Sequence, residues 1–161
     1  MCKIKQMRAL EETEETMTKT NDTIRERTTP AWFVREAEIP GYSPANHHGT
    51  INRRLISAET VGAKHLEVLL GTIEKGKGAL PHAHPGIEQV CYLLAGTARA
   101  EMNGEAVDMV PGDCCFFPPD LPHVFTVTSE TPVRVLVIYS PPYEESPERV
   151  VRFDVHADNH S

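Results

Sequence analysis

Three histidines and one glutamine have the types and the spacing of metal ligands. His82 and His84 are separated by a single residue, and Gln89 follows shortly downstream. On an extended segment these two imidazoles point to the same side, because side chains alternate along a strand. A further imidazole, that of His123, comes from a distant part of the chain. Zinc, iron, manganese, nickel and copper accept nitrogen-rich ligand sets, so the pattern predicts a metal site. The alternative interpretation is a set of unrelated surface or core histidines.

The composition indicates an ordinary globular protein with one domain. The chain has 161 residues, of which 40% are hydrophobic and 24% are charged. Its net charge of -7 argues against a nucleic-acid partner, because phosphate groups would be repelled on average. Arg53 and Arg54 form the only adjacent arginine pair, which is too little for a basic patch.

No segment of the sequence has the length and hydropathy of a membrane span. The most apolar run, residues 135–139, is far shorter than the roughly 18 to 20 residues that a span requires. The N-terminal residues lack the apolar stretch of a secretory signal, so we expect a cytoplasmic protein without a membrane partner. The cysteines form no C-x-x-C pair and are expected to be free thiols, mostly in the core: Cys2, Cys91, Cys114 and Cys115.

The pattern along the chain predicts four segments. Residues 1–29 form a flexible polar leader, because apolar residues are too sparse there to order the backbone. Residues 30–62 form an N-terminal arm that packs on or beside a barrel core over residues 63–143, and residues 144–161 form a C-terminal extension. Short apolar runs separated by Gly and Pro predict strands in the core. These strands are expected at residues 65–73, 87–94, 97–102, 105–109, 114–117, 123–128 and 133–139.

Asn103 and Gly104 carry the strongest hairpin signal of the sequence, because Asn-Gly suits a tight turn with positive φ at both residues. Together with the short strands, this turn favours an all-β fold, an antiparallel barrel preceded by an N-terminal arm. No internal repeat is visible.

The first histidine pair lies in a pattern that resembles the first motif of the cupin family. Gly76 is followed after five residues by His82 and His84, then by Gln89, and after six further residues by Gly96. The resemblance implies a cupin (jelly-roll-like) β-barrel with one divalent metal ion inside.

A second pattern downstream resembles the second cupin motif. Gly112 is followed after five residues by Pro118, and then by Asp120 and His123. Asp120 stands where the family usually has glycine, and Val127 where it often has asparagine. These departures affect the expected shape of the loop more than the metal site. The two motifs together cover about half of the chain.

The resemblance implies that His82, His84 and His123 bind the metal together with one acidic residue. Counted seven residues back from Gly96, the fourth position is Gln89, whereas counted four residues past His84 it is Glu88. Strand parity favours Gln89, which shares a face with Cys91, although Glu88 stays possible. A neutral amide leaves the charge of the metal uncompensated and makes the ion a stronger Lewis acid.

The resemblance implies a metal-dependent enzyme acting on a small polar substrate, such as a carboxylate or a sugar acid. A bound divalent ion (Mn, Fe, Ni, Zn or Cu) would activate the substrate as a Lewis acid. Two alternatives remain open at the level of sequence: a non-catalytic module that binds a metal or a small ligand, and an Fe(II)-dependent dioxygenase. The reaction, the substrate and the native metal are not determined by the motifs.

Cupins are often dimers, so we expect a homodimer. The apolar segment Trp32–Phe33–Val34 lies outside the barrel pattern and is a candidate for exchange with a neighbouring subunit. Among the remaining polar residues, His47 and His48 are expected to be exposed. Arg53 and Arg54 are expected in a solvated strand edge or an interface salt bridge.

Overall fold

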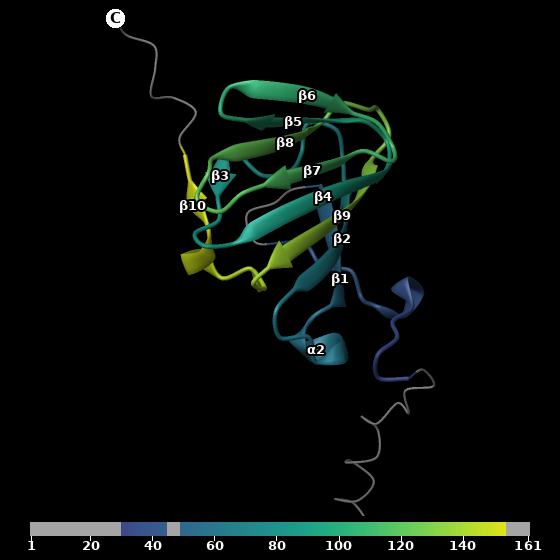
Figure 1. Cartoon of the computed structure of the whole chain (residues 1–161). Helices are drawn as coiled ribbons and strands as arrows, with labels where there is room; N and C mark the ends of the chain where they lie inside the picture. The colour runs from purple at the N-terminus through teal and green to yellow at the C-terminus, as the bar shows by residue number, and fades with distance from the viewer. Residues whose placement is uncertain (1–29, 45–48, 154–161) are drawn as a thin grey trace, which may run out of the picture. The chain divides into compact units, whose positions relative to one another are not determined.

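In the computed structural model, residues 30–44 and 49–153 are described, and they form ten strands in two antiparallel sheets (Figure 1). The leader expected over residues 1–29, residues 154–161, and His47 and His48 lie outside the described residues. The strands are β1 (Thr50–Ile56), β2 (Glu67–Ile73), β3 (His82–Ala83), β4 (Glu88–Ala95), β5 (Ala98–Met102), β6 (Glu105–Met109), β7 (Cys114–Phe117), β8 (His123–Val127), β9 (Val133–Ser140) and β10 (Val151–Arg152).

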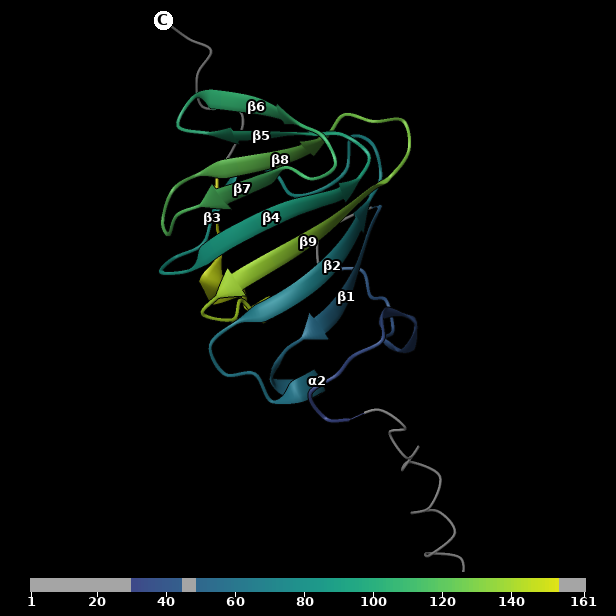
Figure 2. The same ribbon diagram turned by 45° about the vertical axis from the view of Figure 1, so that its right-hand side comes forward.

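The first sheet has the strand order β1-β2-β9-β4-β7 (Figure 2). Its pairing register places side chains in rows across the strands. Gln89 of β4 pairs with Tyr139 of β9, and Tyr139 pairs with Glu67 of β2. Farther along the strands, Gly71 of β2 pairs with Asn52 of β1. These rows fix which side chains face the interior of the barrel.

The second sheet has the strand order β10-β3-β8-β5-β6. Its β5–β6 hairpin turns at Asn103 and Gly104, whose φ angles of 53° and 76° are those of the predicted Asn-Gly turn. The bounds of β6 and β7 agree with the sequence prediction, and five other strands agree to within two residues at each end. The two antiparallel sheets confirm the predicted all-β barrel.

A cluster of buried apolar side chains fills part of the space between the sheets. Leu93, Val133 and Val135 of the first sheet are at most 1% exposed. They pack with inward-facing residues of β5, β6, β7 and β8, because alternate residues of each strand point to the same face. This packed cluster leaves a cavity elsewhere in the barrel, and the histidines lie in that cavity. The full cluster comprises Cys91, Leu93, Ala98, Ala100, Met109, Phe117, Val127, Val133 and Val135.

The segment expected as an N-terminal arm, residues 30–62, contains a strand of the barrel. Its first part carries the short 3-10 helix η1 (Glu36–Glu38), which is tied to β9 by a double hydrogen bond from Arg134 Nη2 to the Glu36 carboxylate, and Tyr42 forms an isolated antiparallel bridge with Asn52. Its second part forms β1 and the single-turn helix α2 (Ala58–Val61), which a Ser57 capping box begins. The arm before the barrel is therefore shorter than the sequence predicted, because β1 is the edge strand of the first sheet.

No helix in the described residues is both long and apolar enough to cross a bilayer. The described cysteines are free thiols: Cys91 is buried, Cys115 is half-buried and Cys114 is exposed. The expectation of core cysteines is therefore correct for Cys91 and wrong for Cys114, which lies on the outer face of β7.

Candidate metal centre

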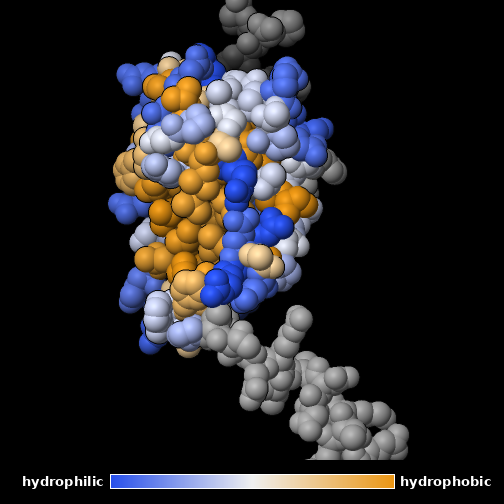
Figure 3. Space-filling view, turned by 90° about the vertical axis from the view of Figure 1, so that its right-hand side faces the viewer, coloured by the Kyte–Doolittle hydropathy of each residue, from blue (hydrophilic) through white to orange (hydrophobic). Residues whose placement is uncertain are grey.

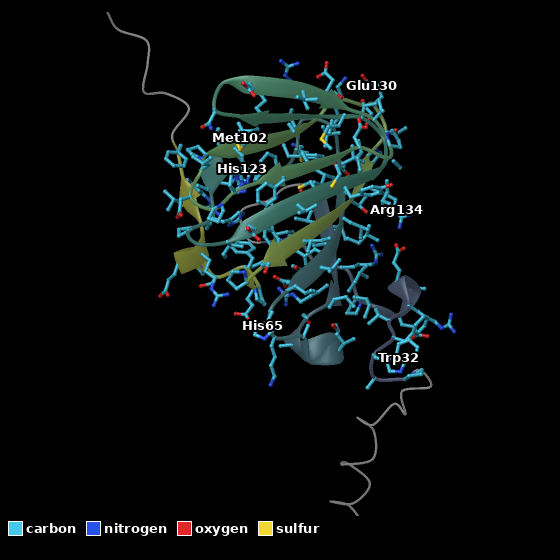
Figure 4. All side chains as sticks on the ribbon, in the orientation of Figure 1. Trp32, His65, Met102, His123, Glu130 and Arg134 are labelled. Atoms are coloured by element: carbon cyan, nitrogen blue, oxygen red, sulfur yellow. The ribbon has the colours of Figure 1, made fainter. Side chains whose placement is uncertain are left out.

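The histidines of the two motifs meet at one end of the cavity. β3 pairs with β8 so that His82 lies directly opposite His123, and His84 follows just after β3. The centroid of the His82 ring lies 4.9 Å from the centroid of the His84 ring and 4.5 Å from that of the His123 ring. Their ligating ring nitrogens all lie within 4.8 Å of one another. The structure thus brings together the three predicted histidines, and Figure 4 shows His123 between the sheets.

Each of these rings is oriented by a hydrogen bond to a backbone carbonyl. A carbonyl oxygen only accepts, so each Nδ1 carries the proton and donates it, and in the neutral ring Nε2 carries the lone pair. Such a bond to the second ring nitrogen is typical of metal-ligating histidines. The pairs are His82 Nδ1 with Leu80 O at 2.8 Å, His84 Nδ1 with Arg149 O at 2.8 Å, and His123 Nδ1 with Leu121 O at 3.0 Å.

The lone pair of His84 is buried without a partner. His84 is 2% exposed, and its Nε2 accepts no hydrogen bond in the described part of the chain. Leaving a buried acceptor unsatisfied costs about 1 to 3 kcal/mol, so such atoms are rare in native proteins. A cation bound at Nε2 would satisfy it. The site therefore fits the divalent metal that the motifs imply.

Gln89 completes the cluster from the inner face of β4. It is 6% exposed, whereas its neighbour Glu88 is exposed on the outer face of the same strand. The predicted strand parity is confirmed. The Gln89 Oε1 atom lies 3.0 Å from His123 Nε2, and the amide donates to Cys91 Sγ at 3.3 Å. With the proton on Nδ1, His123 Nε2 and Gln89 Oε1 are both acceptors and form no hydrogen bond with each other. Two ligand atoms that each lie near 2.1 Å from one metal ion are about 3 Å apart, so the spacing of this pair suits a shared ion.

Burial keeps two of the imidazoles neutral. Desolvation lowers the pKa of His123 to about 4, although its bond to the Leu121 carbonyl acts in the opposite direction. Desolvation likewise lowers the pKa of His84, against the effect of the Arg149 carbonyl. At neutral pH these rings therefore keep the lone pairs that a metal ion requires.

Aromatic rings hold the imidazoles from the sides. Phe117 stacks on His123 with ring centroids 4.1 Å apart and planes 9° apart. Tyr139 and Tyr143 contact His84 edge-on, at 5.2 Å and 4.6 Å between centroids. This packing limits the motion of the rings and shields the cluster from water.

The cluster opens into a cavity of about 480 Å³, a volume suited to a small molecule. Apolar side chains from both sheets dominate its wall, with a few polar groups among them. Glu145 is the acidic residue among the described lining residues, and its Oε1 accepts a hydrogen bond of 2.6 Å from Tyr42 Oη. Polar lining residues besides the cluster are Thr50, Asn52, Tyr139, Tyr143, Glu145 and Arg152.

Sequence reasoning missed a buried ion pair beside the cavity. Glu67 is fully buried, and its carboxylate accepts hydrogen bonds from Arg54 Nε at 2.7 Å and from the backbone N–H of Glu144 at 2.9 Å. Arg54 thus forms an ion pair within the chain. The charged residues in β1 and β2 were visible in the sequence, but nothing there placed Glu67 inside.

The role of the C-terminal segment was also missed. β10 pairs with β3, the strand that begins with His82, and the Arg149 carbonyl just before β10 orients His84. A backbone carbonyl leaves no trace in residue types, so no sequence signal could have found this contact.

The comparisons with known proteins agree with this geometry. The model of a protein family described as "Cupin domain" matches residues 69–139, which include both motifs. Residues 69–139 therefore form a cupin domain. Its solved structural relatives share the barrel: KdgF from Halomonas sp. has a TM-score of 0.61 and 21% identity, covering 70% of this chain and 97% of that one.

Two further relatives of this cupin come from Streptomyces. The tetracenomycin polyketide synthase protein TcmJ of Streptomyces glaucescens is 29% identical over 62% of this chain and 66% of its own. The polyketide cyclase RemF from Streptomyces resistomycificus has a TM-score of 0.64 and 21% identity, covering 78% of this chain and 87% of that one. Other cupins of this fold are described as a predicted oxalate decarboxylase, a sugar phosphate isomerase and a nucleoside dehydratase. The fold therefore accommodates several reaction classes.

Proposed function

We propose that this cupin is a metal-dependent enzyme that activates an oxygen atom of a small organic substrate. The observation that carries the proposal is the convergence of the imidazole nitrogens in the cavity, one of them buried and without a hydrogen-bond partner among the described residues. His82, His84, His123 and Gln89 are the proposed ligands. A divalent ion held by them supplies Lewis acidity, which polarises a carbonyl or hydroxyl oxygen of the substrate.

The side chains around this centre have distinct roles in the proposal. Cys91 accepts the Gln89 amide hydrogen, which aims the amide oxygen at the histidines. Tyr139 and Tyr143 exclude water from the cluster. Glu145 is proposed to take up the proton that a polarised substrate releases, because its carboxylate lines the same cavity. Its backbone has a φ of 52°, a conformation that is unfavourable for a residue with a side chain and that recurs at functional sites.

The cavity wall favours a substrate with an apolar carbon frame. The sequence alone pointed to a carboxylate or a sugar acid. Most of the lining side chains, however, are apolar, and a sugar acid would leave many of its hydroxyl groups without partners there. A carbonyl compound with few other polar groups suits this wall better. The names of the Streptomyces relatives support this choice, because polyketide chains bear repeated carbonyl groups on a carbon backbone.

The test is hydrogen–deuterium exchange next to a carbonyl, followed by proton NMR in heavy water. A panel of 1,3-diketones and aryl ketones is incubated with the metal-loaded protein. We expect exchange above the solvent rate for at least one compound, abolished by a chelator and restored by adding the metal back. His123→Ala should lack the activity, whereas His65→Ala, which changes an exposed histidine, should retain it.

The outcomes also separate the other functions considered. Stoichiometric metal without exchange on any compound would favour a binding module and contradict the enzyme. Oxygen uptake that requires Fe(II) and a bound substrate would favour a dioxygenase instead. Neither alternative has a specific observation in its favour.

A homodimer is the proposed assembly, formed across the outer face of the first sheet. Figure 3 shows a broad apolar patch on one side of the molecule. On this outer face Tyr92 and Leu94 of β4 and Phe116 of β7 are 39%, 40% and 50% exposed. Patches of several hundred Å² mark interaction sites, and a second copy offers a matching uncharged surface.

Light scattering tests the assembly. We expect twice the chain mass for the unaltered protein and a single chain mass for the Tyr92→Lys, Leu94→Glu variant. The Trp32 side chain is 77% exposed, so removal of the residues before Glu38 tests whether the arm contributes. A single chain mass for the unaltered protein would contradict the dimer. The free thiols accord with the cytoplasm as the proposed location.

A further inference from the structure

Two polar side chains of β1 face the cavity far from the histidines. Thr50 is 3% exposed, and within the described part of the chain its Oγ1 has no hydrogen-bond partner. Asn52 follows two residues later, so its side chain points to the same face of the strand. Both residues line the cavity. A buried hydroxyl without a partner is costly unless a ligand or water occupies the space beside it.

A glycine keeps this polar pair open to the rest of the cavity. Gly71 of β2 pairs with Asn52 and also lines the cavity. A Cβ at this position would lie 3.2 Å from Val135 Cγ1 and 3.3 Å from Asn52 Oδ1. Any larger side chain would therefore fill the passage between Asn52 and the rest of the cavity, and a glycine inside a strand is typical of a place where a ligand comes close.

The pairing register sets the distance between the two polar ends. Glu67 shares a row with Gln89, and Gly71 lies four residues farther along β2, which corresponds to about 13 Å. The wall between these ends is apolar and includes Leu69, Val137 and Phe125. The cavity is therefore elongated, with hydrogen-bonding groups at its two ends and apolar side chains between them.

From this arrangement we propose that Thr50 and Asn52 form a second substrate-binding subsite, which binds a neutral oxygen function such as a hydroxyl or carbonyl group. The substrate is then an elongated, largely apolar molecule with oxygen atoms at both ends. The subsite takes a neutral group because a hydroxyl and an amide carry no charge, and Arg54, the cation on the same face of β1, is paired with Glu67. This inference rests on the proposed function for the identity of the end that reacts.

A matched pair of probes tests the subsite by calorimetric titration of the metal-loaded protein. The probes are 4,4′-dihydroxybiphenyl and 4-hydroxybiphenyl, which differ only in the second hydroxyl group. We expect the diol to bind roughly tenfold more tightly, since the second hydroxyl meets Thr50, whose hydroxyl has no partner in the described residues. Thr50→Val and Asn52→Leu keep the side-chain volume, and each variant should bind the two probes with nearly equal affinity. The affinity for 4-hydroxybiphenyl and the metal content should not change.

The control is Thr72→Val, the same substitution on the outer face of the neighbouring strand, which should keep the preference for the diol. In chelator-treated protein both probes should bind more weakly while the preference persists, because the subsite contains no metal ligand. Equal binding of the two probes to the unaltered protein, binding of neither, or a preference that survives in both cavity variants would overturn the subsite. Failure of the proposed function is seen separately, as absence of metal or of deuterium exchange.

Discussion

At the scale of single residues, backbone carbonyls decide what the histidines can do. Each ring donates its Nδ1 proton to a carbonyl oxygen, so the lone pairs of the Nε2 atoms face the shared cavity. His84 shows this most clearly, because its Nε2 is buried and without a partner in the described residues. The residue types and their spacing could be predicted from the sequence. The carbonyl partners could not, because every residue carries the same backbone group.

His84→Ala should remove the metal from the purified protein. We expect the content to fall from one ion per chain to less than about a tenth, because loss of one ligand of a small set costs orders of magnitude in affinity. Elemental analysis after dialysis measures this. His65→Ala is the control, and circular dichroism checks the fold of both variants. Unchanged metal content in the His84 variant would contradict its assignment as a ligand.

Gln89→Leu should weaken metal binding without abolishing it. The imidazole ligands remain, but the amide oxygen 3.0 Å from His123 Nε2 is lost. We expect a dissociation constant raised about 10- to 100-fold, measured by competition with a chromogenic chelator. Glu88→Gln is the matched control on the adjacent, exposed position. A larger increase of the dissociation constant in the Glu88 variant would indicate that Glu88, and not Gln89, is the fourth ligand.

At the scale of elements, β1 and β3 were the hardest strands to predict. The inward positions of β1 are Thr50, Asn52 and Arg54, whereas Ile51, which is 40% exposed, points outward. Apolar residues normally mark the buried face of a strand, but the inward residues of β1 are polar because β1 borders a cavity and a buried ion pair. β3 has only two residues, too few for any periodic signal. Strands that border the packed cluster, such as β4 and β9, followed the usual pattern and were predicted closely.

The C-terminal segment should be required for tight metal binding. Ending the chain after Glu145 removes the Arg149 carbonyl that orients His84 and the β10 strand that pairs with β3. We expect the metal affinity to fall about 10- to 100-fold while the sheets remain folded. Chelator competition and circular dichroism measure the two properties. A chain ending after Phe153 keeps these contacts and should bind normally. Equal affinity of both truncated chains would show that the segment has no part in the site.

At the scale of the whole molecule, the metal-free protein should lose stability in mild acid. The pKa of His123 is about 4 in the folded state and 6.5 ordinarily, so between these values the unfolded chain binds a proton that the native chain does not. The free energy of unfolding therefore falls as the pH drops from about 6.5 to 4. Urea unfolding of the chelated protein across this range measures the slope, and His123→Gln should give a flatter profile. Identical slopes for the two proteins would show that His123 does not titrate as described.

The most direct test of the metal centre is an anomalous difference map from crystals of the metal-loaded protein, recorded at the absorption edge of the ion. We predict one strong peak per chain, about 2.0 to 2.3 Å from the Nε2 atoms of His82, His84 and His123 and close to the Gln89 amide oxygen. A map without a peak among these rings, or with the ion held elsewhere on the barrel, would contradict the metal centre and the function proposed from it.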